Sequence, residues 1–231
     1  MTPATKITLL SACLTVVLAG CGNSEAEPGD VDAGASAADA AATTDATSVD
    51  PGPNDPALLG RWGFPGALEF EFNADGSTRE LVNGQVTLQG TWHTAAGRLI
   101  RRGSAQRFTE AYGVTGDRLF LNRGRAVGAA NGLFATWRFD RSIENLDSQG
   151  NVTALVDPGV LDLTLRMDGT ASSVETLGPL PLVLGQGTWQ IVGAGAALEV
   201  ELAIGGDTTL MQFRLDGDTP AGLAVDRIIT P

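Results

Sequence analysis

The four residues Gln89-Gly90-Thr91-Trp92 return letter for letter as Gln186-Gly187-Thr188-Trp189. In each copy, a run of alternating apolar and polar residues and an Asp-Gly pair precede the repeated letters. The run covers residues 68–72 in the first copy and 161–165 in the second. Alternation with a period of two predicts a β-strand, and Asp-Gly favours the tight turn of a hairpin. The repeat therefore predicts two antiparallel β units of similar design.

The same pattern fills both copies, over residues 57–131 and 132–231. Short alternating runs are separated by turns rich in Gly, Asn and Asp, and no stretch has a convincing helical period. Each copy offers about seven short strands, which is enough to close a small barrel. The sequence therefore predicts an all-β protein with two tandem small antiparallel barrels. One larger merged barrel is the alternative.

Residues 1–20 have the features of a lipoprotein signal peptide. Lys6 supplies a positive charge, and the apolar stretch after it is too short to cross a bilayer as a mature helix. Leu18-Ala19-Gly20-Cys21 then resembles the lipobox of bacterial lipoproteins. The resemblance implies cleavage before the cysteine and its acylation with fatty acids such as palmitate, which would anchor the protein in a membrane of the cell envelope. Gly22 stands where inner-membrane retention would show Asp, which by the same resemblance favours the outer membrane.

Residues 21–56 form the expected tether between this anchor and the folded part. They are dominated by Ala, Asp, Thr, Ser, Gly and Pro, and they include no basic and no aromatic residue. Such a segment cannot bury enough apolar surface to offset the entropy that it would lose on ordering. The sequence therefore predicts a disordered, acidic linker after Cys21.

Three motifs of the first copy resemble the small lipocalin-like domains of bacterial lipoproteins. They are Leu58-Leu59-Gly60-Arg61-Trp62, Asn73-Ala74-Asp75-Gly76 and Gly90-Thr91-Trp92. In the second copy, Leu133-Phe134-Ala135-Thr136-Trp137 aligns with the first of these motifs, with alanine in place of its glycine. The resemblance implies a barrel that holds a small ligand and is closed at one end by Trp62.

Repeated aromatic positions are the candidate ligand-lining residues, namely Trp62, Trp92, Trp137 and Trp189. Packing in a core is the other role that the pattern supports, because each aromatic side chain buries on the order of 150–250 Å². The expected function is non-catalytic binding of a small apolar or amphipathic molecule. The alternative is a surface-exposed structural or protein-interaction module with filled barrels, whose protein partner the residues do not identify.

The folded residues offer little support for catalysis or metal binding. His93 is the only histidine, both cysteines (Cys13 and Cys21) lie before the folded part, and no Gly-x-Ser-x-Gly motif occurs. No glycine-rich loop precedes a helix, so a phosphate-binding loop is unsupported. We therefore expect no enzyme activity, no cofactor and no metal. An enzyme would require polar side chains that converge inside a barrel, which the alternation does not predict.

Charge is distributed unevenly between the copies. The net charge of −12 argues against nucleic-acid binding. Residues 57–131 contain nine arginines and six acidic residues, whereas residues 132–231 contain five arginines and thirteen acidic residues. The arginines of the first copy would form a patch for an anionic ligand, for a lipid head group, or for the acidic second copy and tether; drift between solvated faces is the alternative. The patch would contain Arg98, Arg101, Arg102, Arg107, Arg123 and Arg125.

Overall fold

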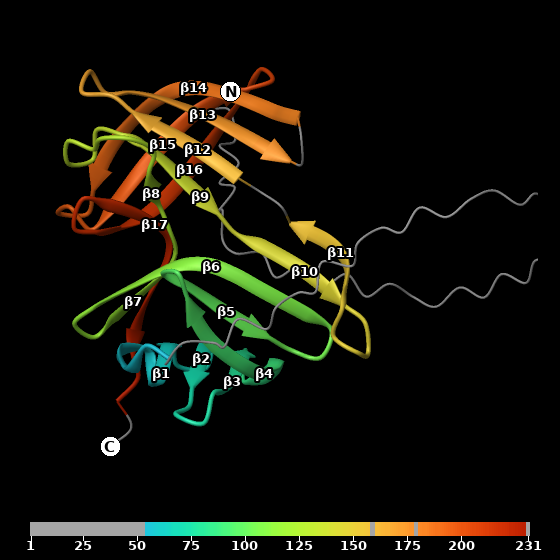
Figure 1. Cartoon of the computed structure of the whole chain (residues 1–231). Coiled ribbons are helices and arrows are strands. Elements are labelled where there is room, and N and C mark those ends of the chain that lie inside the picture. The colour runs from blue at the N-terminus through green and yellow to red at the C-terminus, as the bar shows by residue number, and fades with distance from the viewer. Residues whose placement is uncertain (1–53, 158–159, 178–179, 230–231) are drawn as a thin grey trace, which may run out of the picture. The chain divides into compact units, whose positions relative to one another are not determined.

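The computed structural model describes residues 54–157, 160–177 and 180–229, and within them the protein is all-β (Figure 1). A short 3-10 helix, η1 (Pro56–Leu58), precedes the strands. The strands of the first copy are β1 (Gly60–Phe64), β2 (Leu68–Phe72), β3 (Ser77–Val82), β4 (Gln85–Ala95), β5 (Arg98–Arg102), β6 (Gln106–Thr115), β7 (Arg118–Arg123) and β8 (Arg125–Ala126). Those of the second copy are β9 (Thr136–Asp140), β10 (Ser142–Leu146), β11 (Val152–Asp157), β12 (Val160–Leu165), β13 (Thr170–Leu177), β14 (Leu180–Val192), β15 (Ala197–Ile204), β16 (Asp207–Asp216) and β17 (Thr219–Arg227). The predicted all-β, antiparallel class is confirmed.

Eight of these strands close into an antiparallel barrel, which we call the first barrel. Strands β1 to β7 pair in chain order, each with the next. Strand β17 completes the ring by pairing with β7 on one side and with β1 on the other. Residues from opposite ends of the chain therefore become neighbours: Val225 lies opposite Leu119, and Arg227 lies opposite Trp62.

Strand β8 and most strands of the second copy form a further antiparallel series. Its order is β8, β9, β12, β13, β14, β15, β16 and β17. Strand β17 belongs to both sets, because its first residues pair with β16 and its later residues pair with β7. Strands β10 and β11 form a hairpin, and residues Ser142 to Asn145 of β10 pair with β6 of the first barrel.

Each set of strands encloses its own apolar core. The core of the first barrel contains Leu58, Trp62, Phe70, Phe72, Trp92, Leu99, Leu119, Leu121 and Val225. The core of the second copy contains Ala135, Trp137, Phe139, Leu163, Leu165, Ala171, Leu198, Val200, Leu202, Met211 and Phe213. Removal of these side chains from water is the main favourable contribution to folding.

The opening tryptophan of each copy is held by the same hydrogen bond. The indole N–H of Trp62 donates to the carbonyl oxygen of Leu58 (2.7 Å), and that of Trp137 donates to the carbonyl oxygen of Leu133 (3.0 Å). A buried indole N–H without an acceptor would be costly, so the chain just before each strand supplies one. The two aligned motifs therefore share this local structure.

The glycine of the repeated letters has a steric explanation. A Cβ atom at Gly90 would lie 1.8 Å from the carbonyl oxygen of Arg102, and one at Gly187 would lie 1.8 Å from that of Glu201. In each copy the backbone of the neighbouring strand occupies the space that a side chain would need. Glycine within a strand often marks such a close approach, and both copies require it here.

We expect Gly90→Ala to destabilise the first barrel, because β4 and β5 must separate to admit the methyl group. Overpacking of this kind costs about 1–3 kcal/mol. Urea unfolding followed by circular dichroism measures the loss. Gly103→Ala is the matched control, since an added Cβ there meets nothing closer than 3.5 Å. Equal unfolding free energies for the two variants would contradict the steric explanation.

Candidate functional site

One end of the first barrel is sealed by the segment that precedes β1. Trp62 is fully buried, and the guanidinium carbon of Arg227 lies 4.1 Å from the centroid of its ring. Arg227 also donates to the carbonyl oxygens of Leu59 (2.7 Å) and Ala57 (3.0 Å). A guanidinium over an indole is a favourable cation–π contact. The last strand, the opening tryptophan and the residues around η1 thus close this end together.

Tyr112 adds a polar contact at the sealed end. Its hydroxyl donates to Oδ2 of Asp55 (2.8 Å). Burial, together with this carboxylate, raises the pKa of Tyr112 to about 12, so the phenol stays protonated and acts as a donor. Oδ1 of Asp55 accepts from the backbone N–H of Ala57 (2.9 Å), which caps η1. Asp55 therefore ties the start of the described chain to the barrel.

Three of the four tryptophans predicted to line a ligand lie inside the cores. Trp62, Trp92 and Trp137 are at most 5% exposed, whereas Trp189 is partly exposed and its ring lies 5.9 Å from that of Phe134. Every indole N–H donates to a backbone carbonyl of the protein, those of Leu58, Asn73, Leu133 and Arg166. These side chains fill space and satisfy their own polar groups. A ligand-lining role for them stays a prediction.

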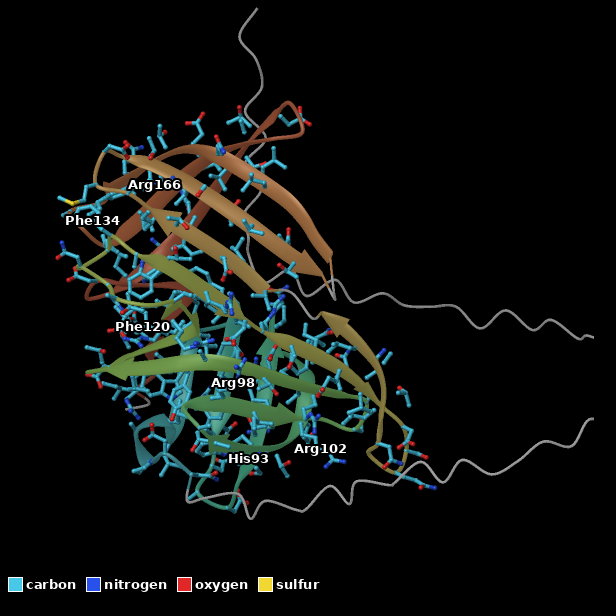
Figure 2. The ribbon with its side chains drawn as sticks, turned by 45° about the horizontal axis from the view of Figure 1, so that its top comes forward. His93, Arg98, Arg102, Phe120, Phe134 and Arg166 are labelled. Carbon is cyan, nitrogen blue, oxygen red and sulfur yellow. The ribbon has the colours of Figure 1, made fainter. Side chains whose placement is uncertain are left out.

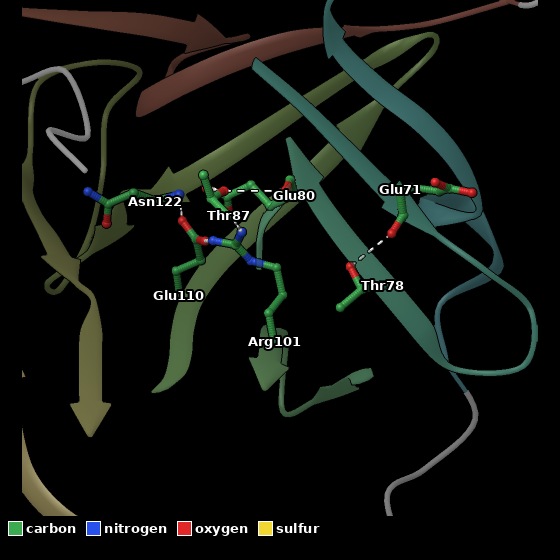
Figure 3. Close-up of polar contacts among 7 residues, drawn as sticks. All are labelled: Glu71, Thr78, Glu80, Thr87, Arg101, Glu110 and Asn122. Atoms are coloured by element: carbon green, nitrogen blue, oxygen red, sulfur yellow. Dashed lines mark hydrogen bonds and ion pairs between the residues drawn. The ribbon is translucent and has the colours of Figure 1, made fainter. Parts of the chain in front are cut away.

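Three charged side chains meet inside the first barrel, and we call them the buried ion cluster (Figure 3). Nη1 of Arg101 donates to Oε2 of Glu80 (2.5 Å), and Nη2 donates to Oε1 of Glu110 (2.7 Å). The exposed fractions of Glu80, Arg101 and Glu110 are 7%, 6% and 4%. The guanidinium carbon also lies 5.1 Å from the ring centroid of Phe70 and 5.3 Å from that of Phe108. The cluster is thus enclosed by aromatic as well as charged groups.

The cluster holds two carboxylates for one guanidinium. Burial by itself would lower the pKa of Arg101, but the charges of Glu110 and Glu80 outweigh this effect and hold that pKa above its usual value. Glu110 further accepts from the backbone N–H of Asn122 (3.0 Å), and the Thr87 hydroxyl donates to the carbonyl oxygen of Glu80 (3.3 Å). Nε of Arg101 is buried and has no hydrogen-bond partner among the described residues. One hydrogen-bond donor of the cluster therefore has no acceptor among the described residues.

Sequence reasoning placed Arg101 in a surface patch and missed the cluster. The alternation of side chains along a strand could have indicated the buried position of Arg101, because residues two apart in a strand face the same side. Arg101 follows Leu99 by two residues, and Leu99 is fully buried. The partners, however, come from β3 and β6, and their meeting depends on how the strands pair.

The other arginines of the predicted patch contact mostly the second copy. Four of them form ion pairs with its carboxylates: Arg98 and Arg125 both with Asp140, Arg107 with Glu144, and Arg123 with Asp216. Arg98 and Arg102 lie at opposite ends of β5 (Figure 2), and Arg102 donates to the carbonyl oxygen of Gly150 (3.2 Å). Each exposed ion pair contributes about 0–1 kcal/mol. The basic first copy and the acidic second copy thus meet through complementary charges.

His93 lies on β4 and is partly buried (Figure 2). Burial and then the charge of Arg107 lower the pKa of His93 from its usual value, which favours the neutral ring. Among the described residues, no three His, Cys, Asp or Glu side chains are grouped so that they could hold a metal ion. The same part of the chain has no helix long and apolar enough to span a bilayer. Cys21 and the predicted signal peptide lie outside the described residues.

Two open grooves lie on the outer surface. The β3–β4 groove has a volume of about 680 Å³, and its lining includes Ser77, Arg79, Gln89, Gly90 and Thr91. The other groove has a volume of about 440 Å³ and lies where the β6–β7 turn approaches the β16–β17 turn; its lining includes Thr115, Arg118, Phe120, Leu215, Asp216 and Asp226. Both volumes fall within the range of about 300–1,000 Å³ that is typical of small-molecule sites.

No protein-family model, no curated protein and no solved structure matches this chain. The resemblances to bacterial lipoproteins and to lipocalin-like domains therefore rest on the sequence motifs and stay predictions. The geometry adds to them a closed eight-stranded barrel with a buried ion cluster and two outer grooves.

Proposed function

We propose that this protein is a non-catalytic interaction module, tethered to a membrane of the bacterial envelope through acylated Cys21, with filled barrels that present their outer surface to a partner. The observation that carries the proposal is the packing of Trp62 and Trp92, which are almost completely buried. Their indole N–H groups donate to backbone carbonyl oxygens of the same chain, those of Leu58 and Asn73. A barrel filled by its own side chains can bind a partner only at its surface. The two grooves described above lie there.

We also propose that the copies are tandem lipocalin-like barrels that exchange their last strands. Trp62 of the first copy lies opposite Arg227 of β17, and Trp137 of the second copy lies opposite Ala126 of β8. Between these pairs, the backbone N–H of Gly124 donates to the carbonyl oxygen of Pro220 (2.8 Å). The opening strand of each copy thus pairs with the closing segment of the other. Two separate cores favour this arrangement over one merged barrel.

Titration of the purified protein with fatty acids and phospholipids, followed by tryptophan fluorescence, tests the filled barrel. We expect no saturable change, because the interior tryptophans already contact protein on all sides. A saturable change at micromolar ligand would contradict the proposal. Circular dichroism of the same sample provides the control that the protein is folded.

The buried ion cluster favours a second candidate function, the binding of a small amphipathic ligand inside the first barrel. At the corresponding positions the second copy has Ser173 in place of Glu80 and Val200 in place of Arg101. Val200 lies opposite Trp189, just as Arg101 lies opposite Trp92. The fold therefore does not need the charges, and a buried ion pair is weak support for stability. The unpaired Nε of Arg101 would donate to an oxygen of the ligand. A fluorescence change that Glu80→Ser/Arg101→Val/Glu110→Met abolishes, in a variant that circular dichroism shows to be folded, would favour this function.

A further inference from the structure

The fold explains only half of the letters Gln-Gly-Thr-Trp. Glycine is required by the close approach of the next strand, and tryptophan packs at the core. The other two side chains are exposed in both copies, and they make no hydrogen bond within the part of the chain that the structure describes. They are Gln89 and Thr91 in the first copy and Gln186 and Thr188 in the second. Neither packing nor internal hydrogen bonding accounts for them.

The surroundings of these side chains have changed between the copies. Gln89 faces Arg79 but Gln186 faces Ser172. On one side Thr91 faces Arg102 but Thr188 faces Glu201, while on the other side both threonines face a hydroxyl residue, Ser77 and Thr170. A requirement of the cross-strand neighbours therefore cannot explain why the glutamine is the same in both copies. The copies differ even in the interior, where Val200 corresponds to Arg101. Exposed residues that persist in altered surroundings indicate contact with a molecule outside the chain.

In the first copy, Gln89 and Thr91 lie on the β3–β4 groove. The other polar groups of its lining are largely neutral. Nδ2 of Asn73 donates to the hydroxyl of Ser77 (3.0 Å), and Arg79 is held by Glu71 through two hydrogen bonds of 3.0 and 2.6 Å. An anionic ligand would have to compete with Glu71 for this arginine. Gly90 supplies a stretch of lining that has no side chain.

We propose that the β3–β4 groove binds an uncharged, hydroxyl-rich ligand, an oligosaccharide, through the side-chain amide of Gln89 and the hydroxyl of Thr91. Both groups donate and accept hydrogen bonds, as sugar hydroxyls do. The inference rests on the proposed function, because it names a ligand for the outer surface of a protein whose barrels are filled. The persistence of the same two residues in the second copy gives that copy a corresponding pair, Gln186 and Thr188.

Calorimetric titration of the purified protein with cellotetraose, maltotetraose and tetra-N-acetylchitotetraose tests the site. We expect at least one of them to bind with a Kd of about 1 mM or lower. Gln89→Ala/Thr91→Val should weaken that binding about tenfold or more, a difference of about 1.4 kcal/mol. Its melting temperature should not change, because both side chains are exposed and unbonded. Gln85→Ala, at the exposed start of the same strand, is the matched control and should bind as the unaltered protein does.

Failure of all three oligosaccharides to bind, or equal affinity of the double variant and the unaltered protein, overturns the groove as a binding site. The fatty-acid titration is separate from this result. A fluorescence change that persists in Gln89→Ala/Thr91→Val would overturn the filled-barrel function alone. Calorimetry with the sugars would still decide the groove.

Discussion

A chain that ends at Asp218 is expected to lose the first barrel, although every residue of β1 to β7 is still present. Strand β17 is the shared neighbour of β7 and β1, so its removal leaves two long unpaired edges. It also removes the fully buried Val225 and the contact of Arg227 with Trp62. Burial of one such aliphatic side chain is worth about 1.5–3 kcal/mol, and a whole domain is stable by only about 5–15 kcal/mol. Thermal unfolding followed by circular dichroism should lose the part of the transition that belongs to the first barrel, whereas the core of the second copy keeps all of its residues.

A synthetic peptide of residues Thr219–Arg227 provides the control for this truncation. When added in excess, it should restore the transition of the first barrel, because it supplies the missing strand to both edges. A peptide of the same composition in scrambled order should not, since Val225 and Arg227 would no longer face their partners. A truncated chain that melts as the full-length protein does would contradict closure of the barrel by β17.

The second large effect is expected at Arg101. Arg101→Met keeps the length of the side chain but leaves Glu80 and Glu110 buried without a positive charge. Loss of one partner from a buried ion pair costs about 3–5 kcal/mol, a large part of the stability of a domain. Urea unfolding at pH 7 measures the loss.

A triple variant separates charge imbalance from loss of packing. Glu80→Ser/Arg101→Val/Glu110→Met removes all three charges; it introduces the corresponding residues of the second copy at the first two positions and an apolar side chain of similar length at the third. Apolar replacement of a complete buried ion cluster is neutral or stabilises by about 1–4 kcal/mol. We therefore expect the triple variant to regain most of the stability that Arg101→Met loses. Equal losses in the two variants would show that packing, and not charge, causes the effect.

Features that depend on a few neighbouring residues could be predicted from the sequence. The Asp-Gly turns are an example: Oδ1 of Asp75 accepts from the backbone N–H of Ser77 (2.8 Å), and Oδ1 of Asp168 accepts from that of Thr170 (2.9 Å). Such contacts form within one turn, so the local letters are sufficient to indicate them. The alternation of strands β2 and β12 is local in the same sense, and it indicated the all-β class.

The buried ion cluster could not be predicted from neighbouring residues of the sequence. Parity indicates which side of a strand a residue faces, but inside and outside are defined only after the strands have paired. Glu80, Arg101 and Glu110 lie on three strands, and β5 pairs with β6 but not with β3. The contact between Arg101 and Glu80 spans β4, which pairs with both β3 and β5, so it depends on the order and register of the strands and not on neighbouring letters of the sequence.

By itself, the sequence determined the antiparallel β class, the turns and the internal repeat, because these follow from the period of the side chains and from the conformations that Gly, Asp and Asn allow. Tertiary structure alone decided which strand closes the first barrel. The edges of β1 and β7 can accept hydrogen bonds from any strand of suitable length, and no local signal distinguishes a strand of the same copy from one of the other. Strand β17 occupies the position because it reaches both edges at once and brings Val225 into the core and Arg227 onto Trp62.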